Sequence, residues 1–142
     1  MLRKSLVLLY GIVCYMLFFI VFNYAILFIG NIIVTPSLDT LRETDLATAL
    51  MIDLGLLGAF AVQHSVMARP AFKRWWTTII RTEVERSTYV LLSTLLLAAI
   101  VFFWQPLGGV IWQLTDPFAI GVVYALFGIG WAILFLASFQ IN

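Results

Sequence analysis

The chain has 142 residues, a formal net charge of +1, 63% hydrophobic and 11% charged residues, and a mean hydropathy of +1.07. Soluble domains carry about 25% charged residues, so this composition excludes an ordinary soluble domain and predicts that lipid covers the apolar excess. The near-neutral charge gives no indication of nucleic-acid binding, and the single cysteine excludes both an intramolecular disulfide and a cysteine-based metal site.

The first apolar segment covers residues 5–34 and contains no charge. About 20 apolar residues cross a bilayer as a helix, whereas the core of a signal peptide has only ~7–15. We therefore expect an uncleaved first span over 5–34. Thr35-Pro36 should end it, because a residue before proline is pushed out of the helical region. Cys14 within this span is expected to be a packing residue.

The second predicted span covers residues 46–67, before Pro70, and contains Asp53. A carboxylate in the hydrocarbon costs several kcal/mol on some scales and about 2.5–3.5 kcal/mol on others. We therefore expect Asp53 to face the interior of a helix bundle, either protonated or hydrogen-bonded to Asn23 of the first span. A structural interhelical bond and a functional role both remain open. Asp53 and His64 lie about three turns apart and should share one face of the helix.

The segment between the second and third spans is basic and aromatic. Its apolar residues recur at helical spacing, with basic residues off that face: Phe72, Trp75, Trp76, Ile79 and Ile80 against Lys73, Arg74 and Arg81. This pattern predicts an amphipathic helix lying in the membrane interface, with its basic side chains toward anionic headgroups. A simple membrane anchor is the plain interpretation of that helix.

The third and fourth predicted spans cover residues 87–104 and 118–139. Thr82 and Glu85 fit a capping box, which favours a start one turn earlier for the third. Asp116-Pro117 predicts an N-cap and first turn for the fourth. Small residues recur along one face of the fourth span and predict close helix packing, including a homo-oligomer contact; they are Gly121, Ala125, Gly128 and Ala132.

The basic residues are unevenly distributed among the loops. All except Arg42 lie at the N-terminus or in residues 69–86. Short cytoplasmic loops are enriched in Lys and Arg, so we expect both termini and the 69–86 segment to face the cytoplasm. The sequence thus predicts an all-α integral membrane bundle of four transmembrane helices with a cytoplasmic interfacial helix, forming one transmembrane domain over residues 1–142.

The chemistry-bearing residues gather at the cytoplasmic end of the second span, in Gln63-His64-Ser65. His64 is the only histidine, and an imidazole can act as a general base or a metal ligand near neutral pH. One histidine makes neither a two-histidine haem site nor a zinc site without partners that this chain lacks, so no metal is predicted. A hydrogen-bonded structural histidine is the alternative.

A family resemblance rests on four stretches, which read QHSVMARPAFKRWW at 63–76, VERSTYVLLS at 84–93, LLYGIVCY at 8–15 and ASFQIN at 137–142. They are similar to bacterial methanethiol S-methyltransferases, a family related to NnrU-like membrane proteins and, more distantly, to isoprenylcysteine carboxyl methyltransferases. The resemblance implies methyl transfer from S-adenosylmethionine to the small thiol methanethiol, giving dimethyl sulfide, at the bacterial inner membrane. Family members are longer, so the chain is expected to match their N-terminal half, with most of the methyl-donor site outside it and its cofactor-binding residues unknown.

Within that resemblance, His64 is the expected base for the thiol proton and Arg69 the expected partner of the thiolate, with Gln63 and Ser65 as positioning residues. Two other functions remain open. Because the NnrU-like relatives include a haem-dependent carotenoid isomerase, His64 could serve as an axial haem ligand whose partner comes from elsewhere. The third interpretation is a non-catalytic membrane scaffold.

Overall fold

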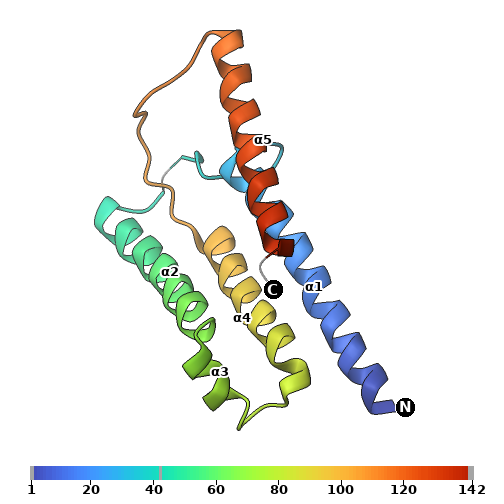
Figure 1. The fold of residues 1–142 in the computed structure, drawn as a ribbon. Helices are drawn as coiled ribbons and strands as arrows, with labels where there is room; N and C mark the ends of the chain where they lie inside the picture. The colour runs from blue at the N-terminus through green and yellow to red at the C-terminus, as the bar shows by residue number, and fades with distance from the viewer. Residues whose placement is uncertain (1, 42, 141–142) are drawn as a thin grey trace. The chain divides into compact units, whose positions relative to one another are not determined.

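The computed structural model describes residues 2–41 and 43–140, which are all helix or loop (Figure 1). It contains the helices α1 (Leu2–Ile29), α2 (Leu46–Met67), α3 (Pro70–Trp76), α4 (Thr82–Phe103) and α5 (Pro117–Gln140). The chain divides into two compact units, Met1–Leu107 and Gly108–Asn142. The first unit therefore holds α1 to α4, and the second holds α5.

Four of these helices are long and apolar enough to cross a membrane, which confirms the prediction of four spans: Leu2–Ile29, Leu46–Met67, Thr82–Phe103 and Pro117–Ala137. Most large apolar side chains on them are exposed; Leu8, for example, is 65% exposed. In water such a surface would be very costly, whereas lipid tails solvate it. The chain is a multi-pass membrane protein.

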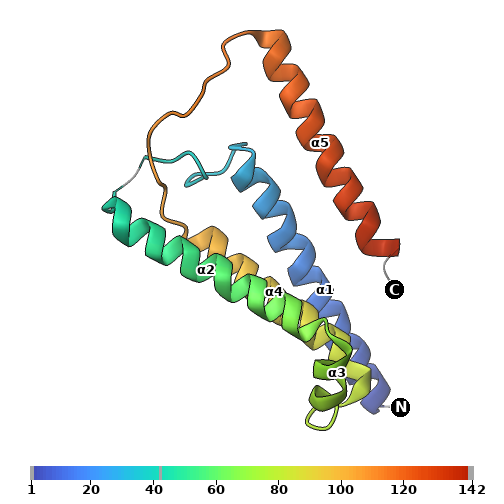
Figure 2. The same cartoon turned by 60° about the vertical axis from the view of Figure 1, so that its left-hand side comes forward.

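Helix α4 lies between α1 and α2 and packs against both (Figure 1). The view in Figure 2 shows α2 lying along α4. Helices α1 and α4 approach closely at Gly11, where a Cβ atom would lie 3.4 Å from the Ser87 hydroxyl oxygen. Further along the pair, Ala25, Phe28 and Val101 form the buried core. Helix α4 is thus the element against which both α1 and α2 pack.

Cys14 is 1% exposed, which confirms its predicted packing role. At the other end of α1, the predicted helix boundary is wrong. The helix ends at Ile29 rather than at Thr35-Pro36, because Asn31 takes a positive φ of 52° and breaks the helical hydrogen-bond pattern. The chain then turns back, and the Leu38 N–H donates to the Phe28 carbonyl, satisfying one of the groups left open at the helix end.

Helix α4 starts at Thr82, about one turn before residue 87, as the sequence favoured, but the predicted capping box is wrong. The N-cap residue is Arg81, one position before Thr82, and no side chain caps the helix there. Glu83 and Glu85 in the first turn instead place negative charge at the positive end of the helix dipole. An ion pair of 3.0 Å between Arg3 and Glu83 joins the start of α4 to α1.

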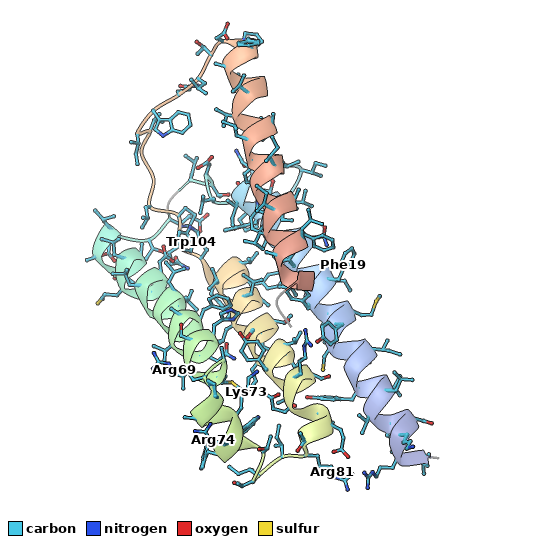
Figure 3. All side chains as sticks on the ribbon, viewed as in Figure 1. Phe19, Arg69, Lys73, Arg74, Arg81 and Trp104 are labelled. Atoms are coloured by element: carbon cyan, nitrogen blue, oxygen red, sulfur yellow. The ribbon has the colours of Figure 1, made fainter. Side chains whose placement is uncertain are left out.

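The interfacial helix is shorter than predicted. Helix α3 ends at Trp76, so Ile79 and Ile80 lie in the following turn and not on its apolar face. The Thr77 hydroxyl lies within hydrogen-bond distance of the Lys73 and Arg74 carbonyls and closes the helix end. The basic residues remain exposed, and Figure 3 shows Arg69, Lys73, Arg74 and Arg81 at the end of the unit where α2, α3 and α4 meet.

The second unit begins with a loop and continues as α5. Its predicted N-cap is confirmed, because the Ala119 N–H donates to the Asp116 carboxylate over 2.8 Å. The small-residue face of α5 is exposed within the structure, and Cβ atoms added at Gly121 or Gly128 would meet nothing within 4 Å. A helix–helix or homo-oligomer contact at this face stays a prediction.

Asp53 is 2% exposed, which confirms that it faces the protein interior. Its partner is not Asn23, whose side chain donates to the Phe19 carbonyl of its own helix over 2.7 Å. The alternative was wrong because α4 lies between the two helices that carry Asp53 and Asn23. Asp53 instead accepts a 2.8 Å hydrogen bond from the backbone N–H of Gln105, just beyond the end of α4. The Gln105 side chain in turn accepts from Thr44 over 2.7 Å, which joins the two loops at this end of the unit.

The Asp53 contact predicts different effects for two substitutions. Asp53→Asn keeps an oxygen that can accept from the Gln105 N–H, whereas Asp53→Leu leaves that N–H without a partner. The unmatched donor should cost about 1–3 kcal/mol, so Asp53→Leu should unfold at a clearly lower temperature than Asp53→Asn. Thermal unfolding in detergent measures this, with Met51→Leu on the exposed face of α2 as the control. Equal stability of the two Asp53 variants would contradict the role of this bond.

Candidate functional site

A polar cluster lies where the last turns of α2 pack on the first half of α4. It consists of Gln63 and His64 from α2 with Tyr89 and Ser93 from α4. Gln63 and His64 are consecutive on one helix, and Tyr89 and Ser93 are four residues apart, so they lie on one face of the other. The packing of α2 on α4 therefore brings together two hydroxyl groups, an amide and the only imidazole in the chain.

The His64 ring is held from two sides. Its face stacks on Phe60 of the preceding turn, with ring centroids 5.2 Å apart and planes 17° apart. The Tyr89 hydroxyl oxygen lies 3.1 Å from Nδ1 and 3.2 Å from Nε2, and the Ser93 hydroxyl oxygen lies 3.4 Å from Nδ1. His64 as a whole remains exposed, so the same ring can also meet a group from outside the described residues.

Gln63 uses both ends of its amide inside the chain. Its nitrogen donates to the Met67 sulfur over 3.1 Å, and its oxygen accepts from the Ser93 hydroxyl over 3.2 Å. Met67 is buried and Ser93 is 9% exposed. The sequence-predicted residue Gln63 therefore belongs to the α2–α4 contact and supports His64 through Ser93.

The other two predicted site residues do not join this cluster in the described structure. Ser65 is exposed on α2, and none of the described contacts connects its side chain to His64. Arg69 is exposed at the N-cap of α3, where its backbone carbonyl accepts from the Lys73 N–H over 3.0 Å. Asp53 shares the α4-facing side of α2 with His64, but about 16 Å of helix separates them, so they do not form one site.

The structure adds Tyr89 and Ser93, which the sequence analysis did not single out. Both lie in the stretch VERSTYVLLS that carries part of the family resemblance. Their four-residue spacing within an apolar span was a usable signal, since polar side chains in a span usually face a protein partner. The sequence did not indicate which helix that partner belongs to.

An imidazole with an unprotonated nitrogen can accept a proton, and His64 is exposed enough for a group outside the described residues to reach it. Among the described residues, no three His, Cys, Asp or Glu side chains are grouped to hold a metal ion. A surface hollow of about 320 Å³ is lined by Arg3, Lys4, Val7, Leu8 and Glu83, and no residue of the polar cluster lines it. The cluster thus contains one group that can exchange a proton near neutral pH, the His64 imidazole.

Comparison with known proteins gives a consistent set of relatives. The chain is 48% identical over 141 residues to the methanethiol S-methyltransferase of Crocosphaera subtropica, covering 99% of this chain and 55% of that protein. It is 41% identical over 140 residues to the methanethiol S-methyltransferase of Mycobacterium tuberculosis, covering 99% of this chain and 57% of that protein. Nurim from Bos taurus is 34% identical over 104 residues, which is 69% of this chain and 39% of nurim.

The chain spans about half the length of the curated methanethiol S-methyltransferases that it matches. No protein-family model matches it. No solved structure matches it either. The resemblance noted in the sequence is thus confirmed by relatives of that name along nearly the whole chain.

The contacts of Gln63 and Ser65 predict different stabilities for their alanine variants. Gln63→Ala removes the acceptor of Ser93 and the donor to Met67, and should lower the free energy of unfolding by about 0.5–1.5 kcal/mol. Ser65→Ala changes an exposed side chain and should stay within about 0.5 kcal/mol of the wild type. Chemical or thermal unfolding of both variants in the same detergent measures the difference. A larger loss in Ser65→Ala than in Gln63→Ala would contradict this geometry.

Proposed function

We propose that this chain, similar along nearly all its length to methanethiol S-methyltransferases, is part of a membrane enzyme that transfers the methyl group of S-adenosylmethionine to methanethiol. The observation that carries this proposal is the 48% identity to the Crocosphaera subtropica protein over 99% of the chain. Because the chain spans about half of that relative, we expect it to correspond to the N-terminal half. The methyl donor is then bound mainly by the part that this chain does not cover.

The reaction needs a thiolate, because the thiolate and not the thiol is the nucleophile. The S–H bond of methanethiol breaks, and its proton passes to a base. The sulfur lone pair then forms a bond to the methyl carbon of the donor while the bond between that carbon and the sulfonium sulfur breaks. The products are dimethyl sulfide and S-adenosylhomocysteine, and the base later returns its proton to water.

We assign the base to His64. It is the only imidazole in the chain, and it is exposed at the end of a membrane-spanning helix, where a small apolar thiol can arrive through the lipid. A positioned general base contributes typically 10²–10⁴-fold to the rate. Arg69, exposed at the start of α3, is the proposed partner of the thiolate anion, and Ser65 is the other exposed polar residue available to the substrate.

The activity can be tested in a chimaera in which this chain replaces the aligned part of the Crocosphaera subtropica enzyme. The chimaera should form dimethyl sulfide, measured in the headspace after adding methanethiol and S-adenosylmethionine. His64→Ala in the chimaera should reduce the rate by about 10²–10⁴-fold. Ile129→Leu, which alters an exposed apolar side chain of α5, is the matched control and should keep the rate.

The two parts of the proposal fail in different ways. A chimaera that inserts normally but forms no dimethyl sulfide would contradict the proposed activity. Full activity in His64→Ala would leave the activity in place and remove His64 as the base. A Soret absorption band in the purified protein would instead favour the haem-binding alternative.

The effect of His64→Ala should depend on pH. As the pH rises toward the pKa of the free thiol, a growing share of methanethiol is already thiolate and needs no base. The loss of rate should therefore be largest at low pH and shrink as the pH is raised. Rates of both chimaeras across the pH range, measured at saturating donor, give this profile. The same fold-loss at every pH would indicate that His64 positions the substrate and does not accept its proton.

We also propose an orientation in the bacterial inner membrane, with the basic segment 69–86 in the cytoplasm. Its support is the distribution of Lys and Arg among the loops, together with the exposed cations at the α2–α3–α4 end of the first unit. This orientation puts the end of α2 that carries His64 at the side where S-adenosylmethionine is made.

Cysteine labelling tests the orientation. Single cysteines introduced as Thr78→Cys and Ile111→Cys, in a Cys14→Ala background, lie in exposed loops at predicted opposite sides. A membrane-impermeant maleimide added to intact cells should label the cysteine at 111 and spare the one at 78 until the cells are opened. Labelling of position 78 in intact cells would reverse the orientation and, with it, the placement of the site.

A further inference from the structure

We infer that Ser93 and Gln63 fix the tautomer of His64, so that Nδ1 carries the ring hydrogen and Nε2 is the basic nitrogen, while the Tyr89 hydroxyl lies over the ring. These three side chains are then positioning residues for His64. The tautomer itself follows from hydrogen-bond counting and is independent of any activity. Its meaning for catalysis rests on the proposed function.

Gln63 sets the direction of the hydrogen bonds in the cluster, because its amide has one donating and one accepting end. The nitrogen faces the Met67 sulfur at 3.1 Å, which can accept only weakly but cannot donate. The oxygen faces the Ser93 hydroxyl at 3.2 Å and can only accept. This orientation of the amide requires Ser93 to donate its hydrogen to Gln63.

Ser93 has only one hydrogen to give. Once that hydrogen points at Gln63, the Ser93 oxygen can interact with the His64 ring only as an acceptor. It lies 3.4 Å from Nδ1, and this contact is a hydrogen bond only when Nδ1 bears the hydrogen. Ser93 is 9% exposed, so water has little access to the hydroxyl to relieve this constraint.

Tyr89 completes the arrangement. Its hydroxyl oxygen lies 3.1 Å from Nδ1 and 3.2 Å from Nε2, and its single hydrogen can serve one acceptor. An oxygen almost equally close to both ring nitrogens lies above the ring plane, because in the plane it would clash with Cε1, so the hydroxyl caps the ring and does not select one nitrogen. The His64 backbone carbonyl, at 3.4 Å, is the more distant alternative. Stacking on Phe60 holds the ring plane while these bonds form.

This arrangement specifies where a substrate proton would go. The base is Nε2, whose lone pair lies in the ring plane, and the thiol hydrogen must approach it there. The Nδ1–H tautomer is not the one that a free histidine side chain prefers in water, where the hydrogen resides mainly on Nε2, so its presence would be a signature of these contacts.

The single histidine makes the tautomer directly measurable. This chain, labelled with ¹⁵N-histidine and purified in detergent at a pH where the ring is neutral, gives two ring nitrogen resonances that can come only from His64. We expect the Nδ1–H pattern, with the Nε2 resonance in the unprotonated range. A predominant Nε2–H pattern in the wild-type chain would overturn the inference without any variant being needed.

Three variants sharpen the test. Gln63→Met removes the acceptor of Ser93, which is then free to donate to Nδ1, so the tautomer should change to Nε2–H. Ser93→Ala should abolish the preference for Nδ1–H, whereas Tyr89→Phe should keep that pattern. Val66→Ala, on the exposed part of α2, is the control and should leave both resonances in place. An unchanged tautomer in Gln63→Met, with normal helix content, would contradict the role of Gln63 and Ser93.

The chimaera separates this inference from the proposed function. If the tautomer is as expected and the chimaera forms no dimethyl sulfide, the positioning contacts stand and the activity fails. If the chimaera is active but the ring shows Nε2–H, the activity stands and the inference fails. In an active chimaera, Gln63→Met should lower kcat more than it changes KM for methanethiol, because the ring remains present but offers the wrong nitrogen.

Discussion

The structure depends on one constraint, which is that polar groups inside an apolar helix must find hydrogen-bond partners, either on their own helix or on a neighbouring one. In lipid there is no water to satisfy them, and each unsatisfied group costs several kcal/mol. Helix α4 meets this constraint on both sides. Its Thr88 side chain contacts Tyr10 of α1 over 3.0 Å, and its Ser93 contacts Gln63 of α2. The apolar packing around these contacts is thin, so the polar pairs are what specify how α1, α2 and α4 fit together.

The same constraint explains why the candidate site and the helix packing cannot be separated. Interhelical hydrogen bonds in membranes are modest, with a measured average of about 0.6 kcal/mol and peptide values of about 1–2 kcal/mol. The contacts around His64 are therefore of the size expected for bonds that orient a ring within a membrane helix pair. Asp53 is the contrasting case. It is buried at the far end of the α2–α4 pair and bonded to the Gln105 backbone, which suits a fixed structural contact.

The extent of the match to the relatives bears on what the candidate site contributes. The chain matches about half of the methanethiol S-methyltransferases, and its described residues hold the His64 imidazole beside an amide and two hydroxyl groups. An enzyme of two substrates needs both a nucleophile site and a donor site. The proposed function gives this chain the first of these roles, with His64 exposed on one side and stacked on Phe60 on the other.

The sequence by itself determined the membrane class, the number of spans, the boundaries of α2, and the N-cap of α5 at Asp116. These features depend on local quantities, namely the length of apolar runs and the residue types beside helix ends. The sequence also singled out His64 as a candidate site residue and placed Asp53 in the protein interior, because a lone ionisable group in a span has few tolerable places. The sequence did not predict the end of α1 correctly, because the positive φ of Asn31 ends the helix before Pro36 does.

Only the tertiary structure decided which residues meet across the helices. The partner of Asp53 is a backbone N–H of Gln105, and the partners of His64 are Tyr89 and Ser93, all separated from them by 25 residues or more along the chain. Such pairs depend on how far α4 is rotated about its own axis and how it is shifted along α2. The apolar sequence of these helices is nearly uniform around their circumference, so it carries little information about that rotation. The few polar side chains that fix it act only once the helices are side by side.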